Sequence, residues 1–427
     1  MKILFFGLGA VGAVMATTLQ QLYRRQGEPL ELAFAVRDEA RARASLFRNR
    51  ELQDQARFIA FEDNASCRAF APQMVINAAT PELNNTIAER ALALGADYAD
   101  MASDIYNEQT LQQMCFSQQS LQQAFVDADR MGLINLGFSP GLTNFVIGEK
   151  IAHLRALPGV AQIRSVRLFL LEELISSRVL FSWSPKVALD ELMARPAYIR
   201  DGALQRIKPF SAIRPYAFDL GDSTETYPIF QEEVLSLHHS YPQIDEIRLY
   251  CGGNEVELFK NLYQLNLLSR DLKVGSAPVE QVVRKVLPKM KSPRVIEYYN
   301  KRHIIKSARF EVVAEIETVT ASRQRPVVES VGIRFSRYRE LLGGPYSGAT
   351  YIAYPTGVAA AVLVFYSLLG RAQGVSLNGI IAPELLPERL GSDLSDRIKR
   401  ELVELGIEFS NRMNSAEREW RAHSQPT

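Results

Sequence analysis

The first 38 residues constrain the fold of this chain more than any other segment. Apolar residues 3–6 are followed at once by Gly7-Leu8-Gly9-Ala10-Val11-Gly12, then by a helical pattern at 13–22 and a second apolar run at 32–36. This order predicts strand, turn, helix and strand, with Gly-x-Gly-x-x-Gly in the place that a dinucleotide-binding fold requires. The plainer alternative, a glycine-rich turn in an ordinary α/β domain, explains one glycine more easily than three in register.

The residues of this turn have separate expected roles. Gly7 permits the tight turn, Gly9 lets the backbone approach a pyrophosphate, and Gly12 lets the helix pack closely on the strand. The amino end of the helix that follows offers unpaired N–H groups and the positive end of the helix dipole to the phosphates.

The residues at the end of the second apolar run indicate which dinucleotide the chain binds. An NAD site usually has an acidic residue there, which binds the ribose hydroxyls. Here Arg37 follows Val36. A cation suits a 2′-phosphate, so we expect NADP(H), with NAD as the alternative. Asp38 keeps NAD open, because a one-residue shift would let it bind a ribose. The plainer interpretation of Arg37 is a solvated loop cation.

Size, charge and cysteine content define the broad class. A chain of 427 residues with a formal charge of +1 is long enough for two or three domains and indicates neither a nucleic-acid groove nor a membrane surface. Its three cysteines are scattered, which predicts a reducing, cytoplasmic location. An expected strand from Lys2 leaves no room for a signal peptide. The apolar run 357–369 is expected to be a buried helix, because it is too short to span a bilayer.

Strand and helix patterns continue to alternate after Asp38. We expect helices at 39–47, 83–94 and 110–131, and strands at 74–77, 98–101 and 133–136. Alternation of this kind predicts a parallel, doubly wound sheet, which binds its ligands beyond the carboxyl ends of the strands. The candidate cofactor residues at those ends are Gly7, Gly9, Ala10, Val11, Gly12, Arg37, Asp38, Asn77, Ala78, Ala79, Thr80, Pro140 and Thr143.

The pattern changes after Gly141. Alternating apolar and polar residues between 166 and 335 predict a mostly antiparallel sheet in an α+β domain. Helices return at 356–369, capped by Thr356, and at 392–405, capped by Ser392. We therefore expect a Rossmann domain at 1–137, an inserted substrate and dimerisation domain at 138–344, and C-terminal helices at 345–427 that pack back on the Rossmann domain.

The segment Gly137–Asn144 is the second informative stretch. Pro140 and Gly141 fix a turn at a helix entrance, and Thr143 lies in the first helical turn, near the expected nicotinamide. A capped domain crossover is the plainer interpretation, and both interpretations can hold.

The chain has no Tyr-x-x-x-Lys and no Gly-x-Ser-x-Gly motif. It also has no Cys/His cluster for zinc, so no metal is expected. Hydride transfer to an organic cofactor needs none.

Several further segments carry a resemblance to a known family. In this order and spacing the chain resembles the saccharopine dehydrogenase family, with its saccharopine reductase, lysine 6-dehydrogenase and carboxynorspermidine dehydrogenase branches. The segments are Gly7–Gly12, Val75-Ile76-Asn77-Ala78-Ala79, Gly95-Ala96-Asp97-Tyr98-Ala99-Asp100, Gly137–Asn144, Phe181-Ser182-Trp183-Ser184-Pro185, Arg200-Asp201-Gly202, Glu225-Thr226-Tyr227-Pro228 and Gly379-Ile380-Ile381-Ala382-Pro383-Glu384.

The resemblance implies a pyridine-nucleotide oxidoreductase that acts on a carbon–nitrogen bond of an amino acid or opine-like secondary amine. It also implies a Rossmann domain completed by C-terminal helices, and commonly a homodimer. Arg37 resembles the NADP-using branches, whereas Pro140–Asn144 and Ser182–Pro185 resemble lysine 6-dehydrogenase. An NAD-dependent lysine 6-dehydrogenase is therefore the first alternative, and a non-catalytic dinucleotide-binding sensor or scaffold is the second.

Oxidation or reduction at such a bond requires one proton to be moved. Asp100, at a strand's carboxyl end, is the first candidate for this role, with a structural cap as its equal alternative. Tyr227 and Glu225 are weaker candidates from the second domain. An amino-acid substrate needs a cation for its carboxylate, and Arg178 is the hypothesis. The plainer and favoured interpretation of Arg178 is an ordinary charged strand residue.

Overall fold

The fold is described from a computed structural model, which places residues 1–104, 114–157, 160–181, 189, 192–218, 223–288, 291–320 and 326–413. A seven-stranded sheet forms the first domain, in the order β17-β6-β5-β4-β1-β2-β3, and all its pairings are parallel. Its strands are β1 (Lys2–Phe6), β2 (Glu31–Val36), β3 (Arg57–Ala60), β4 (Met74–Asn77), β5 (Asp97–Asp100), β6 (Met131–Leu133) and β17 (Gly379–Ile381).

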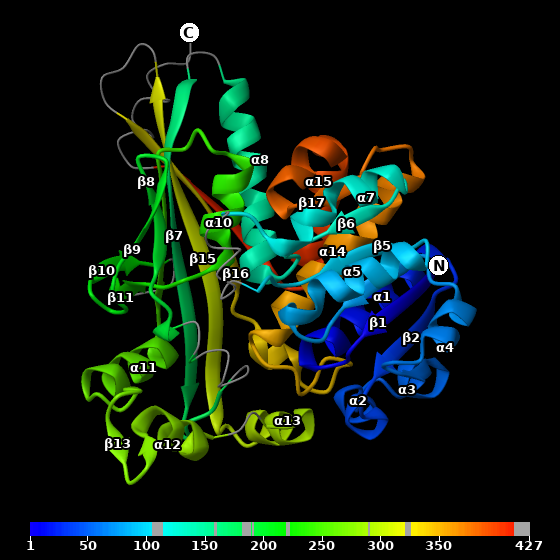
Figure 1. Cartoon of the computed structure of the whole chain (residues 1–427), viewed down its shortest axis with the longest axis horizontal. Coiled ribbons are helices and arrows are strands. Elements are labelled where there is room, and N and C mark those ends of the chain that lie inside the picture. Colours follow the sequence, from blue (N-terminus) through cyan, green and yellow to red (C-terminus); the bar gives the residue numbers. More distant parts are fainter. Residues whose placement is uncertain are drawn as a thin grey trace.

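Helices cover both faces of this sheet (Figure 1). Ile3 and Phe5 of β1 belong to one apolar core, and Leu4 and Phe6 belong to a second core on the opposite face. Side chains alternate along a strand, so a strand that is apolar at every position can only be buried on both sides. The helices are α1 (Ala10–Gln26), α2 (Glu39–Ser45), α3 (Arg50–Gln55), α4 (Asn64–Phe70), α5 (Asn84–Ala93) and α7 (Gln122–Asp127).

Nine strands form a second, mixed sheet within the described residues, and Figure 1 shows it beside the first domain. The strands are β7 (Val160–Ser176), β8 (Ala197–Arg200), β9 (Ala203–Arg206), β10 (Arg214–Ala217), β11 (Ser223–Pro228), β12 (Glu246–Gly252), β15 (Ile305–Thr320), β16 (Val327–Phe335) and β18 (Glu408–Met413). The sheet is antiparallel as predicted, except where β12 pairs with β7 in parallel.

Further elements pack around the second sheet or join it to the first. These are α8 (Thr143–Ala156), α10 (Glu232–Ser240), α11 (Asn254–Gln264), β13 (Lys273–Val274), β14 (Ala277–Pro278), α12 (Val279–Val286), α13 (Pro293–Lys301), α14 (Ala353–Ala372) and α15 (Leu386–Glu404), with short 3-10 turns at Pro81–Leu83, Ser117–Leu121, Tyr338–Leu341 and Pro383–Leu385. The core that contains Ile3 and Phe5 runs without a break from the first sheet into the second.

The C-terminal segment does more than add helices to the first domain. β17 extends the first sheet beside β6, whereas β18 pairs with β16 in the second sheet. The segment after residue 345 therefore links both sheets, which the helical pattern alone did not indicate.

Two helix predictions need correction. The long helix expected at 110–131 is wrong, because a 3-10 turn at Ser117–Leu121 and the short helix α7 precede β6, and 105–113 lie outside the described residues. Helix α14 begins at Ala353, so Thr356 lies inside the helix and is not its cap. Thr350 Oγ1 accepts a hydrogen bond from the Ala353 amide at the start of the helix.

Helix α14 also corrects the argument from length. Its 20 residues are long and apolar enough to cross a membrane, but 83% of its most apolar window is buried inside the protein. The expectation of a buried helix is thus confirmed by packing and not by length.

Helix α15 has a break at Gly391, with φ +78°, directly before the predicted cap Ser392. Ser182–Pro185 and the chain after Ser415 lie outside the described residues.

Candidate dinucleotide site and interdomain acidic cluster

The glycine turn after β1 lies against the loop after β4. Gly7 has φ +85°, and a Cβ there would come within 2.8 Å of the Ala79 Cα atom. A Cβ on Gly12 would lie 3.0 Å from the Ala78 Cβ. Gly7 therefore supplies both a left-handed turn and a close backbone approach, and no other residue type fits it without strain.

The amino end of α1 is open to a ligand. No side chain caps it at Gly9, no acidic residue lies in its first turn, and the first helical hydrogen bond runs from the Ala13 amide to the Gly9 carbonyl over 2.9 Å. Gly9 is exposed, and a Cβ placed there would meet nothing within 4 Å. The free amides and the open space before them fit a dinucleotide pyrophosphate.

The two charged residues after β2 differ in what they are free to bind. Arg37 is exposed, and its guanidinium lies 5.0 Å from the centroid of the Phe61 ring. Asp38 is the N-cap of α2, where its carboxylate accepts a hydrogen bond of 2.9 Å from the Arg41 amide. The cap therefore engages one oxygen of the Asp38 carboxylate, while the guanidinium can reach a ligand.

Asn77 positions the loop after β4. Its side-chain oxygen accepts the Ala79 amide at 2.9 Å, and its nitrogen donates to Asn84 Oδ1 at 2.7 Å and to the Thr80 carbonyl at 3.1 Å. Ala79 and Thr80 are exposed beside the glycine turn. Asn77 thus holds the loop, and the exposed backbone after it is what a cofactor could contact.

The turn after β6 lies close to the same edge. A Cβ on Gly137 would come within 3.2 Å of the Met101 carbonyl and 3.3 Å of Thr356 Cγ2, and a Cβ on the next residue of α14, Gly357, would lie 2.7 Å from the Val11 carbonyl. These contacts connect the turn, α14 and the amino end of α1 in one packed group. The Ser139–Pro140 bond is cis, Pro140 is buried, and Thr143 Oγ1 donates to the Phe138 carbonyl.

Asp100 is at the carboxyl end of β5 as predicted, but it is only 1% exposed. One carboxylate oxygen accepts the Asn135 amide at 2.8 Å, and the other accepts Tyr98 OH at 2.9 Å and Gln118 Nε2 at 3.0 Å. Burial raises the pKa of Asp100 to about 6. These contacts favour the structural alternative, in which Asp100 ties β5 to the segment after β6.

Three further carboxyl groups from other elements form a chain of electrostatic neighbours with Asp100, which runs from Asp100 to Glu232, Glu233 and Glu384. Glu232 Oε1 accepts the Ser103 amide at 3.2 Å, Glu233 accepts a hydrogen bond from the Ser139 hydroxyl, and Glu384 accepts Ser236 Oγ at 2.6 Å. Burial raises the pKa of Glu232 to about 8, with a contribution from Glu233, and that of Glu233 to about 7, with one from Glu384. We call Asp100, Glu232, Glu233 and Glu384 the acidic cluster.

The remaining predicted catalytic residues lie apart from this cluster. Tyr227 is 1% exposed, donates to Glu225 Oε2 over 2.5 Å, and accepts from Lys260 Nζ over 2.9 Å. Arg178 is exposed just after β7, with its guanidinium 5.8 Å from the centroid of the Tyr299 ring in α13. In the described residues, the contacts of Asp100, Tyr227 and Arg178 do not bring these three side chains together.

Ser139, Glu232 and Glu233 were not selected from the sequence. Two adjacent glutamates at the start of a helix ordinarily interact with the helix dipole at the surface, so they carry no signal of burial. Ser139 lies inside a motif that we did select, but nothing local identifies its partner 94 residues away.

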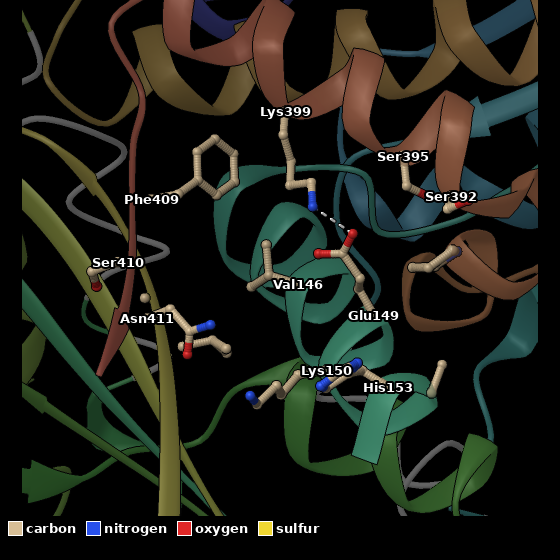
Figure 2. Close-up of a pocket in the computed structure, with 14 residues that line it drawn as sticks. Val146, Glu149, Lys150, His153, Ser392, Ser395, Lys399, Phe409, Ser410 and Asn411 are labelled. Carbon is tan, nitrogen blue, oxygen red and sulfur yellow. Dashed lines mark hydrogen bonds and ion pairs between the residues drawn. The ribbon is translucent and has the colours of Figure 1, made fainter. Parts of the chain in front are cut away.

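A cavity of about 590 Å³ lies between α8, α15 and β18 (Figure 2). Its lysines are already paired: Lys399 Nζ lies 2.7 Å from Glu149 Oε1, and Lys150 forms a buried ion pair with Glu329. The cavity contains none of the predicted cofactor or catalytic residues. Within the described ranges, no group of three or more His, Cys, Asp or Glu side chains is arranged to hold a metal ion.

Comparisons with known proteins bear mainly on the fold. No protein-family model matches the chain. Carboxyaminopropylagmatine dehydrogenase from Synechocystis sp. is 24% identical over 187 residues, which cover 44% of this chain and 46% of that protein, so the match spans less than half of the relative. Saccharopine dehydrogenase (L-Glu forming) from Saccharomyces cerevisiae, in its apo form, has a TM-score of 0.64 at 14% identity and covers 96% of this chain and 99% of that chain.

The parallel seven-stranded sheet, its glycine turn and the mixed second sheet define a two-domain protein of the Rossmann class. Within that class the chain has the saccharopine dehydrogenase fold, which confirms the resemblance that its motifs indicated.

Proposed function

We propose that the chain is an NADP(H)-preferring oxidoreductase that acts on a carbon–nitrogen bond of an amino acid or opine-like secondary amine. The observation that carries the proposal is the open amino end of α1, with the exposed Arg37 at the end of the neighbouring strand. Because Asp38 caps α2, one oxygen of the acidic group that an NAD ribose would need is engaged. The names of the relative and of the structural neighbour, both dehydrogenases, support the same class.

When bound, the nicotinamide would supply the hydride acceptor or donor, and the chain would supply position and proton handling. Residues 7–12 and 78–80 would hold the pyrophosphate and the adjoining ribose. The turn at 137–142 would face the nicotinamide, because it packs through Thr356 and Gly357 toward the amino end of α1. We propose a homodimer in the cytoplasm as the working form, with the three free cysteines as support for a reducing compartment.

Two alternatives predict different results. An NAD-dependent lysine 6-dehydrogenase would bind NAD more tightly than NADP and would oxidise lysine. A sensor or scaffold would bind a dinucleotide without turnover.

Calorimetric titration with NADPH and NADH, followed by absorbance assays with both cofactors over a panel of amino acids, opines and carbonyl–amine pairs, distinguishes these outcomes. Tighter NADPH binding with turnover of a secondary amine supports the proposal. Absence of binding to either dinucleotide would refute it. Sedimentation of the purified protein tests the dimer.

A further inference from the structure

We propose that Ser139 and Glu233 form the proton-transfer pair of this reaction, with the Ser139 hydroxyl facing the substrate nitrogen and the Glu233 carboxylate exchanging the proton through it. The inference rests on the proposed function, since it assigns a role within the same site.

The position of Ser139 is the first support. It follows β6 at the carboxyl edge of the parallel sheet, where ligands of such sheets bind. It is half-buried, whereas Phe138 and Pro140 on either side are buried, so Ser139 is the exposed point of the turn. The packing of Gly137 against Met101 and Thr356 places the turn beside the loop after β5 and beside α14.

The state of Glu233 is the second, independent support. Glu233 is fully buried, with an exposed fraction of 0%. Its Oε1 atom accepts the hydrogen bond of Ser139, but its Oε2 atom is buried without a hydrogen-bond partner. A buried carboxylate with an unsatisfied oxygen is costly, and it persists where it has a function or carries a proton. Ser139 is the one hydrogen-bond partner that leads from this carboxyl group toward the exposed edge in the described part of the chain.

The surroundings of Glu233 favour a proton near neutral pH. Glu384 disfavours the charge of Glu233, and Glu233 and Asp100 in turn disfavour the charge of Glu232. The strands that pack on α10 supply little positive charge to stabilise an ionised Glu233. Arg248 of β12 is paired with Glu246, and Arg200 of β8 is exposed. Burial raises the pKa of Glu233 to about 7, while the Ser139 hydrogen bond lowers it. A group with this pKa suits general acid–base work.

In oxidation, the C–H bond next to nitrogen breaks and its hydride passes to the oxidised cofactor, which leaves an iminium. The iminium N–H bond then breaks, the proton goes to Ser139 Oγ, and the serine proton goes to the Glu233 carboxylate. The products are an imine, the reduced cofactor and protonated Glu233, which returns its proton to solvent. Reduction runs the same transfers in reverse.

The test compares E233Q, S139A and E233D with the wild type, with the exposed E404Q as a control. An infrared pH titration of the protein without cofactor should show a carboxylic acid band that titrates near pH 7, is lost in E233Q, and has a raised midpoint in S139A. The raised midpoint is expected because the lost hydrogen bond favoured the charged form. Loss of this band in E233Q together with an unchanged midpoint in S139A would overturn the pairing, and so would a band that persists in E233Q.

The kinetic arm uses carboxylated secondary amines. We expect E233Q to lower kcat by about 10²- to 10⁴-fold at unchanged KM and to remove the limb near pH 7, with partial recovery in E233D. A merely structural role would change stability or KM and keep the limb. Wild-type kcat and pH profile in E233Q would overturn the proposal. Calorimetry with NADPH separates the two proposals, because E233Q should bind it normally, whereas no binding by the wild type would refute the proposed function.

Discussion

Gly357 of α14 lies directly against the backbone carbonyl of Val11 in the first turn of α1, and a Cβ on Gly357 would lie only 2.7 Å from that oxygen. The contact joins a helix from the C-terminal part of the chain to the loop that is proposed to bind the pyrophosphate. Residues separated by most of the chain therefore determine how this loop sits on the sheet.

The first prediction tests this contact. G357A should lower the free energy of unfolding by about 1–3 kcal/mol, because the added methyl group overpacks the α1–α14 interface. It should also weaken NADPH binding by displacing the first turn of α1. Urea denaturation and calorimetry measure the two effects. G344A is the matched control, since its Cβ would have only an ordinary contact at 3.7 Å. Equal stability of both variants would contradict the packing argument.

Cofactor preference should depend on Arg37 and not on Asp38. R37A should weaken NADPH binding by at least tenfold and leave NADH binding nearly unchanged, because only NADPH carries a 2′-phosphate. D38A should lower stability by about 1 kcal/mol through loss of the α2 cap and preserve the ratio of the two affinities. Calorimetric titration of both variants with both dinucleotides provides the answer. A ratio that changes only in D38A would favour an NAD site.

The contribution of the buried carboxyl groups to the free energy of unfolding should fall as the pH rises. The raised pKa values of Asp100, Glu232 and Glu233, about 6, 8 and 7, mean that the folded state holds protons that the unfolded state releases. Their favourable contribution is present in full below about pH 4 and is lost progressively as the pH rises to about 8. Denaturation between pH 5 and 8.5 measures the slope. E232Q should be more stable than the wild type at pH 8 and nearly equal at pH 5, and the reverse order would contradict the shifts.

The two lysines that line the cavity of Figure 2 should differ in their effect on stability. Lys150 and Glu329 are 7% and 6% exposed, so K150M would leave a buried charge and cost about 3–5 kcal/mol. Lys399 and Glu149 are 29% and 32% exposed, so K399M should cost less than about 1 kcal/mol. The double variant K150M/E329L should recover most of the loss. Similar costs for both single variants would show that burial does not control these pairs.

D100N distinguishes the two roles of Asp100. The asparagine nitrogen would face groups that now donate to the carboxylate, so we expect a loss of about 1–3 kcal/mol in stability with unchanged NADPH affinity. Denaturation and calorimetry test this structural role. A large loss of turnover at unchanged stability would instead support Asp100 as the proton carrier.

Much of the first domain could be predicted because its signals are local. The apolar strand at 2–6, the glycine turn and the positions of β4 and β5 follow from patterns within a few residues, and α5 lies where its apolar spacing placed it. The helix expected at 110–131 failed because a 3-10 turn and the short helix α7, and not one continuous helix, place Phe116 and Phe125 in the core beside Tyr98 of β5. The contact of β18 with β16 depends on a partner more than 70 residues away, which no local pattern specifies.

The sequence alone thus determined the parallel sheet and the glycine turn, because a covered strand must be apolar at every position and a left-handed close approach requires glycine. Only the tertiary structure decided that Asp38 is a cap, that Asp100 is enclosed by three donors, and that Ser139 contacts Glu233. The physical reason is that the burial and charge of a carboxyl group depend on side chains from distant segments of the chain. The residues next to it in the sequence do not specify which segments these are.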